Sequence, residues 1–68
     1  MEKQEEFVER MIEEQKALKE KIVKLNAFIV DQKFNQLDDY NKSLLIRQRE
    51  GMAVYFETLT ARISLNLK

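Results

Sequence analysis

The chain has 68 residues, with one glycine, no proline, no cysteine and no histidine, and its 12 acidic side chains balance 12 basic ones. This composition indicates one all-helical domain and argues against a disulfide framework or a zinc site. Because no net charge favours an anionic surface, we expect no binding to membranes or double-stranded nucleic acid. We also expect no cofactor and no metal. The acidic start of the chain is unlike a signal peptide, which favours a cytoplasmic protein.

The first predicted helix covers about residues 5–30. Its apolar side chains recur at steps of three, four and seven, in keeping with the period of a helix. Acidic residues gather in its first half and lysines in its second, as the helix dipole favours. The periodicity then lapses, which predicts a connection over about residues 31–37. Phe34 and Leu37 should hold this connection against the ends of the helices.

The second predicted helix covers about residues 38–66, with Asp38 as its N-cap. Folded back on the first helix, it makes residues 1–68 a single antiparallel helical hairpin. Its only glycine, Gly51, falls at the expected crossing, where a missing side chain would let the two backbones approach. The residues on its predicted inner stripe are Leu44, Leu45, Gln48, Met52, Tyr55, Leu59, Arg62 and Ile63.

A second apolar stripe on this helix indicates self-association. One seam between two helices buries too little apolar surface to fold a chain of this size alone. Left bare, the second stripe would form a large exposed apolar patch. We therefore expect a homo-oligomeric helical bundle, resembling a coiled coil. The predicted oligomer interface consists of Ile46, Ala53, Phe56, Ile63 and Leu67.

Three polar residues, Gln48, Tyr55 and Arg62, form a ladder at seven-residue spacing where leucine is usual. Polar residues at such positions most often set helix register. The ladder also has the chemistry of a nucleotide site, because a ring can stack a base, an amide can read its edge and a guanidinium can hold a phosphate. Basic residues brought near by the fold-back would extend this site, although charged helix faces are usually only solvated. These basic residues are Lys21, Lys24 and Arg47.

Catalysis finds little support in the sequence. The serine and threonine hydroxyls have no histidine to activate them, and no glycine-rich phosphate loop is present. We therefore expect a binding protein and not an enzyme.

Three segments, EKIVKLNAFI, FNQL and LLIRQREGMAVYFETLTARI, resemble a family of very short proteins from tailed bacteriophages, related to a crAss-like phage protein. The shared pattern ends the first helix with K-x-x-K-L-x-x-F-I and places F-x-x-L in the connection. Its second helix reads L-L-x-x-Q-x-x-x-M-x-x-Y-x-x-x-L-x-x-R-I, and the glutamine, tyrosine and arginine are its most distinctive positions. In this sequence the pattern falls on Lys21, Lys24, Leu25, Phe28, Ile29, Phe34, Leu37, Leu44, Leu45, Gln48, Met52, Tyr55, Leu59, Arg62 and Ile63.

By size and helical build, such proteins are similar to phage sponges that counter the CBASS and Thoeris defence systems by sequestering nucleotide second messengers. The resemblance implies a homo-oligomer in the host cytoplasm during infection. It also implies a small anionic nucleotide, a cyclic oligonucleotide or a cyclic ADP-ribose-type signal, in pockets between subunits. The alternative is a structural or adaptor bundle that docks on a host or phage protein.

Overall fold

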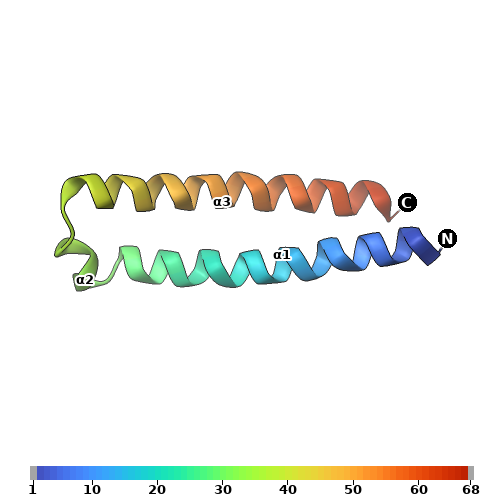
Figure 1. The fold of residues 1–68 in the computed structure, drawn as a ribbon, viewed down its shortest axis with the longest axis horizontal. Helices are drawn as coiled ribbons and strands as arrows, with labels where there is room; N and C mark the ends of the chain where they lie inside the picture. Colours follow the sequence, from blue (N-terminus) through green and yellow to red (C-terminus); the bar gives the residue numbers. More distant parts are fainter. Residues whose placement is uncertain (1, 68) are drawn as a thin grey trace.

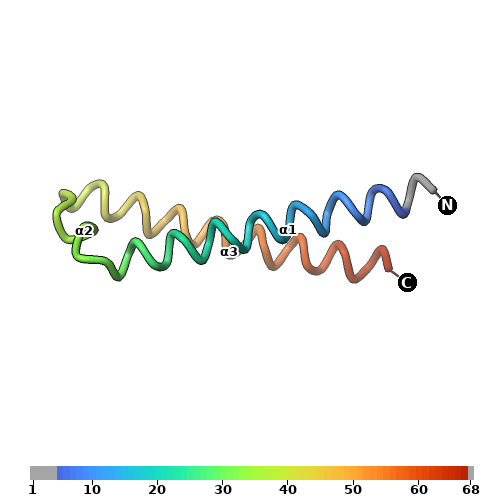
Figure 2. Tube along the Cα trace, turned by 90° about the horizontal axis from the view of Figure 1, so that it is seen from below, coloured from blue at the N-terminus to red at the C-terminus, as the bar shows by residue number. Residues whose placement is uncertain are grey.

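The computed structural model describes residues 2–67, and the side chains of residues 5–67. This part of the chain is all-α with two long helices, as predicted: α1 spans Glu2–Ile29, α2 spans Gln32–Asn35 and α3 spans Asp39–Asn66. Helices α1 and α3 run antiparallel, so the start of α1 lies beside the end of α3 (Figure 1). A view from below shows that they cross near their middles (Figure 2). No helix in the described residues has the length and apolarity needed to cross a bilayer.

The connection between the long helices is built around Phe34. Asp31 caps α2, and its carboxylate accepts a hydrogen bond from the backbone N–H of Lys33 at 2.8 Å. Phe34 is buried, and its ring meets Phe28 edge-on with 6.2 Å between centroids. The ammonium of Lys42 lies 5.9 Å from the Phe34 ring centroid. The prediction that Phe34 holds the connection against the helix ends is confirmed.

Asp38 begins α3 as predicted. Its backbone is extended, and its carboxylate accepts the backbone N–H of Asn41 at 2.8 Å. Asp39 in the first turn adds negative charge at the positive end of the helix dipole. The start of α3 is therefore fixed by its own side chains.

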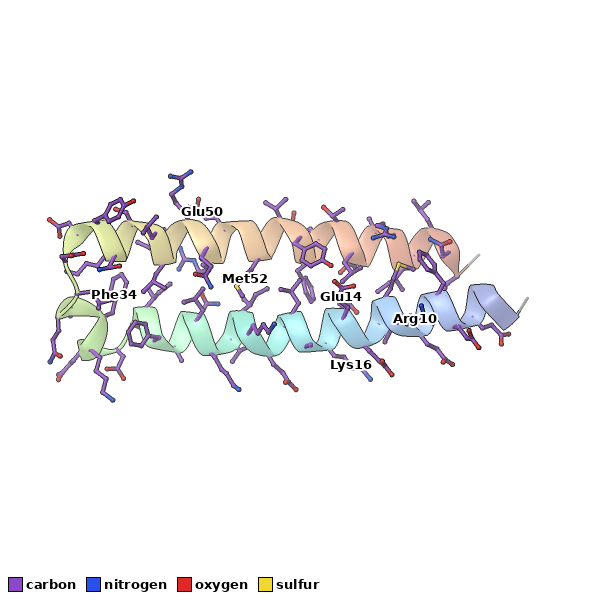
Figure 3. All side chains as sticks on the ribbon, in the orientation of Figure 1. Arg10, Glu14, Lys16, Phe34, Glu50 and Met52 are labelled. Atoms are coloured by element: carbon purple, nitrogen blue, oxygen red, sulfur yellow. The ribbon has the colours of Figure 1, made fainter. Side chains whose placement is uncertain are left out.

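The core between α1 and α3 is concentrated near the two chain ends. Leu59 is fully buried there, and it packs in one cluster with Val8, Met11 and Ile63. Toward the connection the seam is less closed, and Met52 lies between the helices only half-buried (Figure 3). Other half-buried apolar residues in this part include Ile22, Leu25, Leu45 and Ile46. Within a single chain, the seam is therefore better buried near the chain ends than near the connection.

The row of α3 that faces α1 agrees with the predicted inner stripe at Leu45, Met52, Leu59 and Ile63, and differs from it at the three ladder positions. The residues on this inner face are buried or half-buried: Arg49, Met52, Phe56, Leu59 and Ile63. The polar ladder is instead exposed at all three positions, Gln48, Tyr55 and Arg62. The prediction was wrong at the ladder positions because the row through Gln48, Tyr55 and Arg62 and the row through Arg49, Phe56 and Ile63 lie only about 100° apart on a helix. Burial favours the more apolar of the two, which includes Phe56 and Ile63.

The placement of Gly51 at the crossing was also wrong. A Cβ atom built on Gly51 would meet no heavy atom within 4 Å, so α1 does not approach it. Its neighbour Met52 occupies the seam instead (Figure 3). Glycine in a helix interior costs about 1 kcal/mol relative to alanine. No close contact within the described chain offsets that cost.

The fold divides the predicted oligomer stripe between two environments. Ile63 is buried in the core with α1, and Ile46 and Phe56 are half-buried. Ala53 and Leu67 are exposed. Ile46, Phe56 and Ile63 therefore have less surface free for a second copy, because α1 covers part or all of each side chain. A role for any of these five residues in an interface between copies stays a prediction.

Candidate functional site

The ladder residues follow one edge of the seam, and two of them contact α1. The Tyr55 hydroxyl donates a hydrogen bond to the carboxylate of Glu14, which points from α1 toward α3 (Figure 3). The guanidinium carbon of Arg62 lies 5.7 Å from the ring centroid of Phe7, within cation–π range. Both side chains therefore tie α3 to α1. A phosphate beside Tyr55 would also meet the negative charge of Glu14.

The other predicted ligand residues lie on the surface. Gln48 and Arg47 are exposed on α3, and Lys21 and Lys24 are exposed on α1. Exposed side chains do not enclose a ligand by themselves. A pocket at these residues therefore needs surface from a second molecule.

A different edge of the seam carries a hollow that the sequence analysis missed. The hollow has a volume of about 270 Å³, is open to solvent and is lined by Gln15, Lys16, Lys19 and Phe56. Phe56 comes from α3 and the other three from α1. Lys16 and Lys19 are neighbours on the helix surface because they are three residues apart. This spacing can be read from the sequence as a pair of adjacent positive charges. It indicates a site only when Phe56 is known to lie in the seam beside them.

The Gln15 amide is held in place at this hollow. Its Nε2 donates to the hydroxyl of Thr60 at 2.6 Å. That hydroxyl donates in turn to the backbone carbonyl oxygen of Phe56 at 2.8 Å. The two bonds fix the amide of Gln15 beside Phe56.

The hollow suits part of a planar anionic ligand. Phe56 offers an aromatic surface for stacking, and the amide of Gln15 offers hydrogen bonds. Lys16 and Lys19 offer ammonium groups to phosphate oxygens. Closed small-molecule pockets usually measure about 300–1,000 Å³, so this open hollow holds only a portion of such a ligand.

Comparison with models of protein families identifies the family of this chain. The family model Sequestin matches residues 5–65. The chain belongs to the Sequestin family. The family name indicates sequestration of a molecule, and the Sequestin match includes both the hollow and the polar ladder. No curated protein and no solved structure matches the chain.

Proposed function

We propose that this Sequestin-family protein binds a nucleotide second messenger of bacterial immunity and holds it away from its receptor. The observation that carries the proposal is the family match over residues 5–65. The aromatic, amide and basic side chains at the seam edges support an anionic ligand with a planar base, such as a cyclic oligonucleotide or a cyclic ADP-ribose-type signal. In a cell infected by a phage that carries the protein, this binding would counter the host's defence.

The hollow is the first candidate for the ligand site. In this proposal Phe56 stacks on a base, Gln15 bonds its edge, and Lys16 and Lys19 hold phosphate. The second candidate is the ladder edge predicted from the sequence. We favour the hollow because both of its charges are positive, whereas Tyr55 is bonded to the Glu14 carboxylate. The ladder-edge candidate consists of Gln48, Tyr55, Arg62, Lys21, Lys24 and Arg47.

We place the complete pocket between subunits of a homo-oligomer. Small-molecule sites usually bury most of the ligand surface, and the open hollow of one chain does not. A second subunit over the hollow would supply the missing cover. The residues that line the hollow include no nucleophile with an adjacent general base, so we propose retention without turnover.

Native mass spectrometry tests this proposal. The purified protein is mixed with cyclic dinucleotides, cyclic trinucleotides and isomers of cyclic ADP-ribose. We expect one ligand class to be retained at a fixed ratio to subunits and with its mass unchanged. Retention of none of them, together with capture of one protein partner, would favour the adaptor function instead. The exposed apolar residues of α3 are the observation that supports this second candidate.

Two matched variants locate the ligand. Lys19→Ala removes a charge from the hollow, and Arg62→Ala removes one from the ladder edge. A hydrogen bond to a charged group contributes about 1.5–3 kcal/mol, roughly ten- to a hundredfold in affinity. We expect Lys19→Ala to show that loss and Arg62→Ala to bind nearly as the native protein does. The reverse result would assign the site to the ladder, and unchanged binding in both would exclude both edges.

A further inference from the structure

α3 carries an apolar surface on the side away from α1, distinct from the predicted oligomer stripe. We call this surface the outer face of α3. It consists of two rows at seven-residue spacing: Leu44, Gly51, Thr58 and Leu65, and beside them Tyr40, Arg47, Val54 and Ala61. The two rows are centred about 150° from the inner face, given 3.6 residues per turn. All eight residues are exposed within one chain, and the four large apolar side chains are between 42% and 72% exposed.

We infer that two copies of the chain pack through their outer faces, α3 against α3 in antiparallel orientation, with Gly51 of each copy facing Val54 of the other. The inference concerns assembly and does not depend on the proposed ligand. Reversing one helix places the row that contains Gly51 opposite the row that contains Val54. This seven-residue pattern is the one by which paired helices interlock.

In this register small side chains face large ones. Val54 meets Gly51 at the centre, and Leu44 meets Ala61 further out. Such alternation lets side chains interdigitate and brings the helices close together. The space at Gly51, where a Cβ would meet nothing within 4 Å, receives the Val54 side chain of the second copy. That contact offsets the cost of a glycine inside a helix.

Charge favours the antiparallel orientation. In that register Arg47 faces Thr58 of the second copy, and Glu57 lies about 1.5 Å further along that helix, so the long Arg47 side chain can reach across to form an ion pair with it. The two-fold symmetry of a dimer makes this ion pair twice. In a parallel dimer of the same face, Arg47 would meet Arg47, and like charges at an interface repel.

The exposed area of the single chain agrees with such a contact. The chain measures 51 × 15 × 14 Å and exposes 5700 Å². A compact protein of 8.2 kDa exposes about 4,500 Å². The excess of about 1,200 Å² is comparable to the roughly 800 Å² that each partner contributes to a specific interface.

Matched variants on two faces of α3 test the contact. Gly51→Leu adds a side chain to the outer face, and Ser64→Leu enlarges one at an exposed position about 140° away, outside both the outer face and the predicted oligomer stripe. We expect Gly51→Leu to raise the dimer dissociation constant at least tenfold by sedimentation, and Ser64→Leu to leave it within twofold. Circular dichroism should show full helicity in both, because a Cβ at Gly51 meets no atom of its own chain. A native protein that is monomeric at micromolar concentration, or the reverse order of the two variants, would overturn the inference.

Disulfide trapping tests the orientation, and it is unambiguous because the chain has no cysteine of its own. In the antiparallel register Leu65 of one copy lies about 37 Å from Leu65 of the other, at 1.5 Å per residue. We expect a mixture of Leu44→Cys and Ala61→Cys chains to form a cross-linked dimer on oxidation. Leu65→Cys alone should form none. A cross-linked dimer of Leu65→Cys together with none in the mixture would overturn the antiparallel contact.

Discussion

Val23 and Val54 are nearly equally exposed in the single chain, at 58% and 62%, but their surroundings differ. Val23 lies on α1, close in sequence to the exposed Lys21 and Lys24. Val54 lies on the outer face of α3, in the middle of a row of apolar and small residues. Isolated exposed apolar residues are ordinary, whereas a contiguous set marks a contact surface. The contiguous exposed apolar surface therefore lies on α3, and the surroundings of Val23 on α1 form no such surface.

The largest expected effect lies on the inner face of α3. Leu59 is 0% exposed, so Leu59→Ala should lower the free energy of unfolding by about 2–5 kcal/mol through lost burial and a cavity. Urea unfolding followed by circular dichroism measures this change.

Leu65→Ala is the matched control, because Leu65 lies on the outer face of the same helix. It should change the unfolding free energy of the single chain by less than about 0.5 kcal/mol and weaken dimerisation instead. Equal losses in the two variants at low protein concentration would remove the distinction between the faces.

The second prediction uses the two valines directly. Val54→Lys places an unpaired charge in the proposed dimer contact and should cost about 2 kcal/mol of association, roughly thirtyfold in the dissociation constant. Val23→Lys should leave both association and unfolding unchanged, because it adds a solvated charge to a polar surface. Sedimentation equilibrium of both variants checks this. Equal association in the two variants would mean that α3 has no second partner surface.

The same comparison explains what could be predicted from the sequence. The two long helices, the cap at Asp38 and the position of Phe34 follow from local patterns, and the structure agrees with each. The inner face of α3 follows only in part, because a helix with apolar residues on two sides has no unique apolar stripe. Only contact with α1 determines that Phe56, and not Tyr55, enters the seam.

The hollow was unpredictable for a related reason. Its residues come from both long helices, so it exists only at one relative rotation of α1 and α3. The sequence analysis placed Tyr55 instead of Phe56 in the seam and assigned Phe56 to the predicted oligomer stripe. Lys16 and Lys19 therefore had no aromatic neighbour in the predicted hairpin. Sequence patterns therefore identified candidate residues on the ladder, but they missed the hollow that a single chain forms.

The third prediction concerns the start of α3, which its own side chain caps. Asp38→Ala removes the bond to the Asn41 N–H and should cost about 1 kcal/mol of unfolding free energy. Asp38→Asn should be close to neutral, because asparagine caps about as well. Thermal and urea unfolding check both variants. A neutral Asp38→Ala would show that packing by α1 alone fixes this helix end.

The smallest expected effect comes from removing one hydrogen bond between α1 and α3. Thr60→Val removes the hydroxyl that accepts the hydrogen bond from the Gln15 amide. The change should lower the free energy of unfolding by about 0.5–1 kcal/mol. Thr58→Val is the control, because its hydroxyl bonds only the carbonyl of Val54 in the same helix. Urea unfolding of the single chain should separate the two. An equal loss in both would mean that the Gln15 bond does not stabilise the seam.

The claim that this Sequestin-family protein sequesters its ligand is tested most directly by retention followed by recovery. A cyclic dinucleotide and a cyclic ADP-ribose isomer are each dialysed against the protein at equilibrium, and the bound fraction is then released by heat. We predict that one of them is depleted from solution in proportion to the protein and is recovered in full with its mass unchanged. Both nucleotides remaining free, or recovery of a cleaved product, would contradict sequestration.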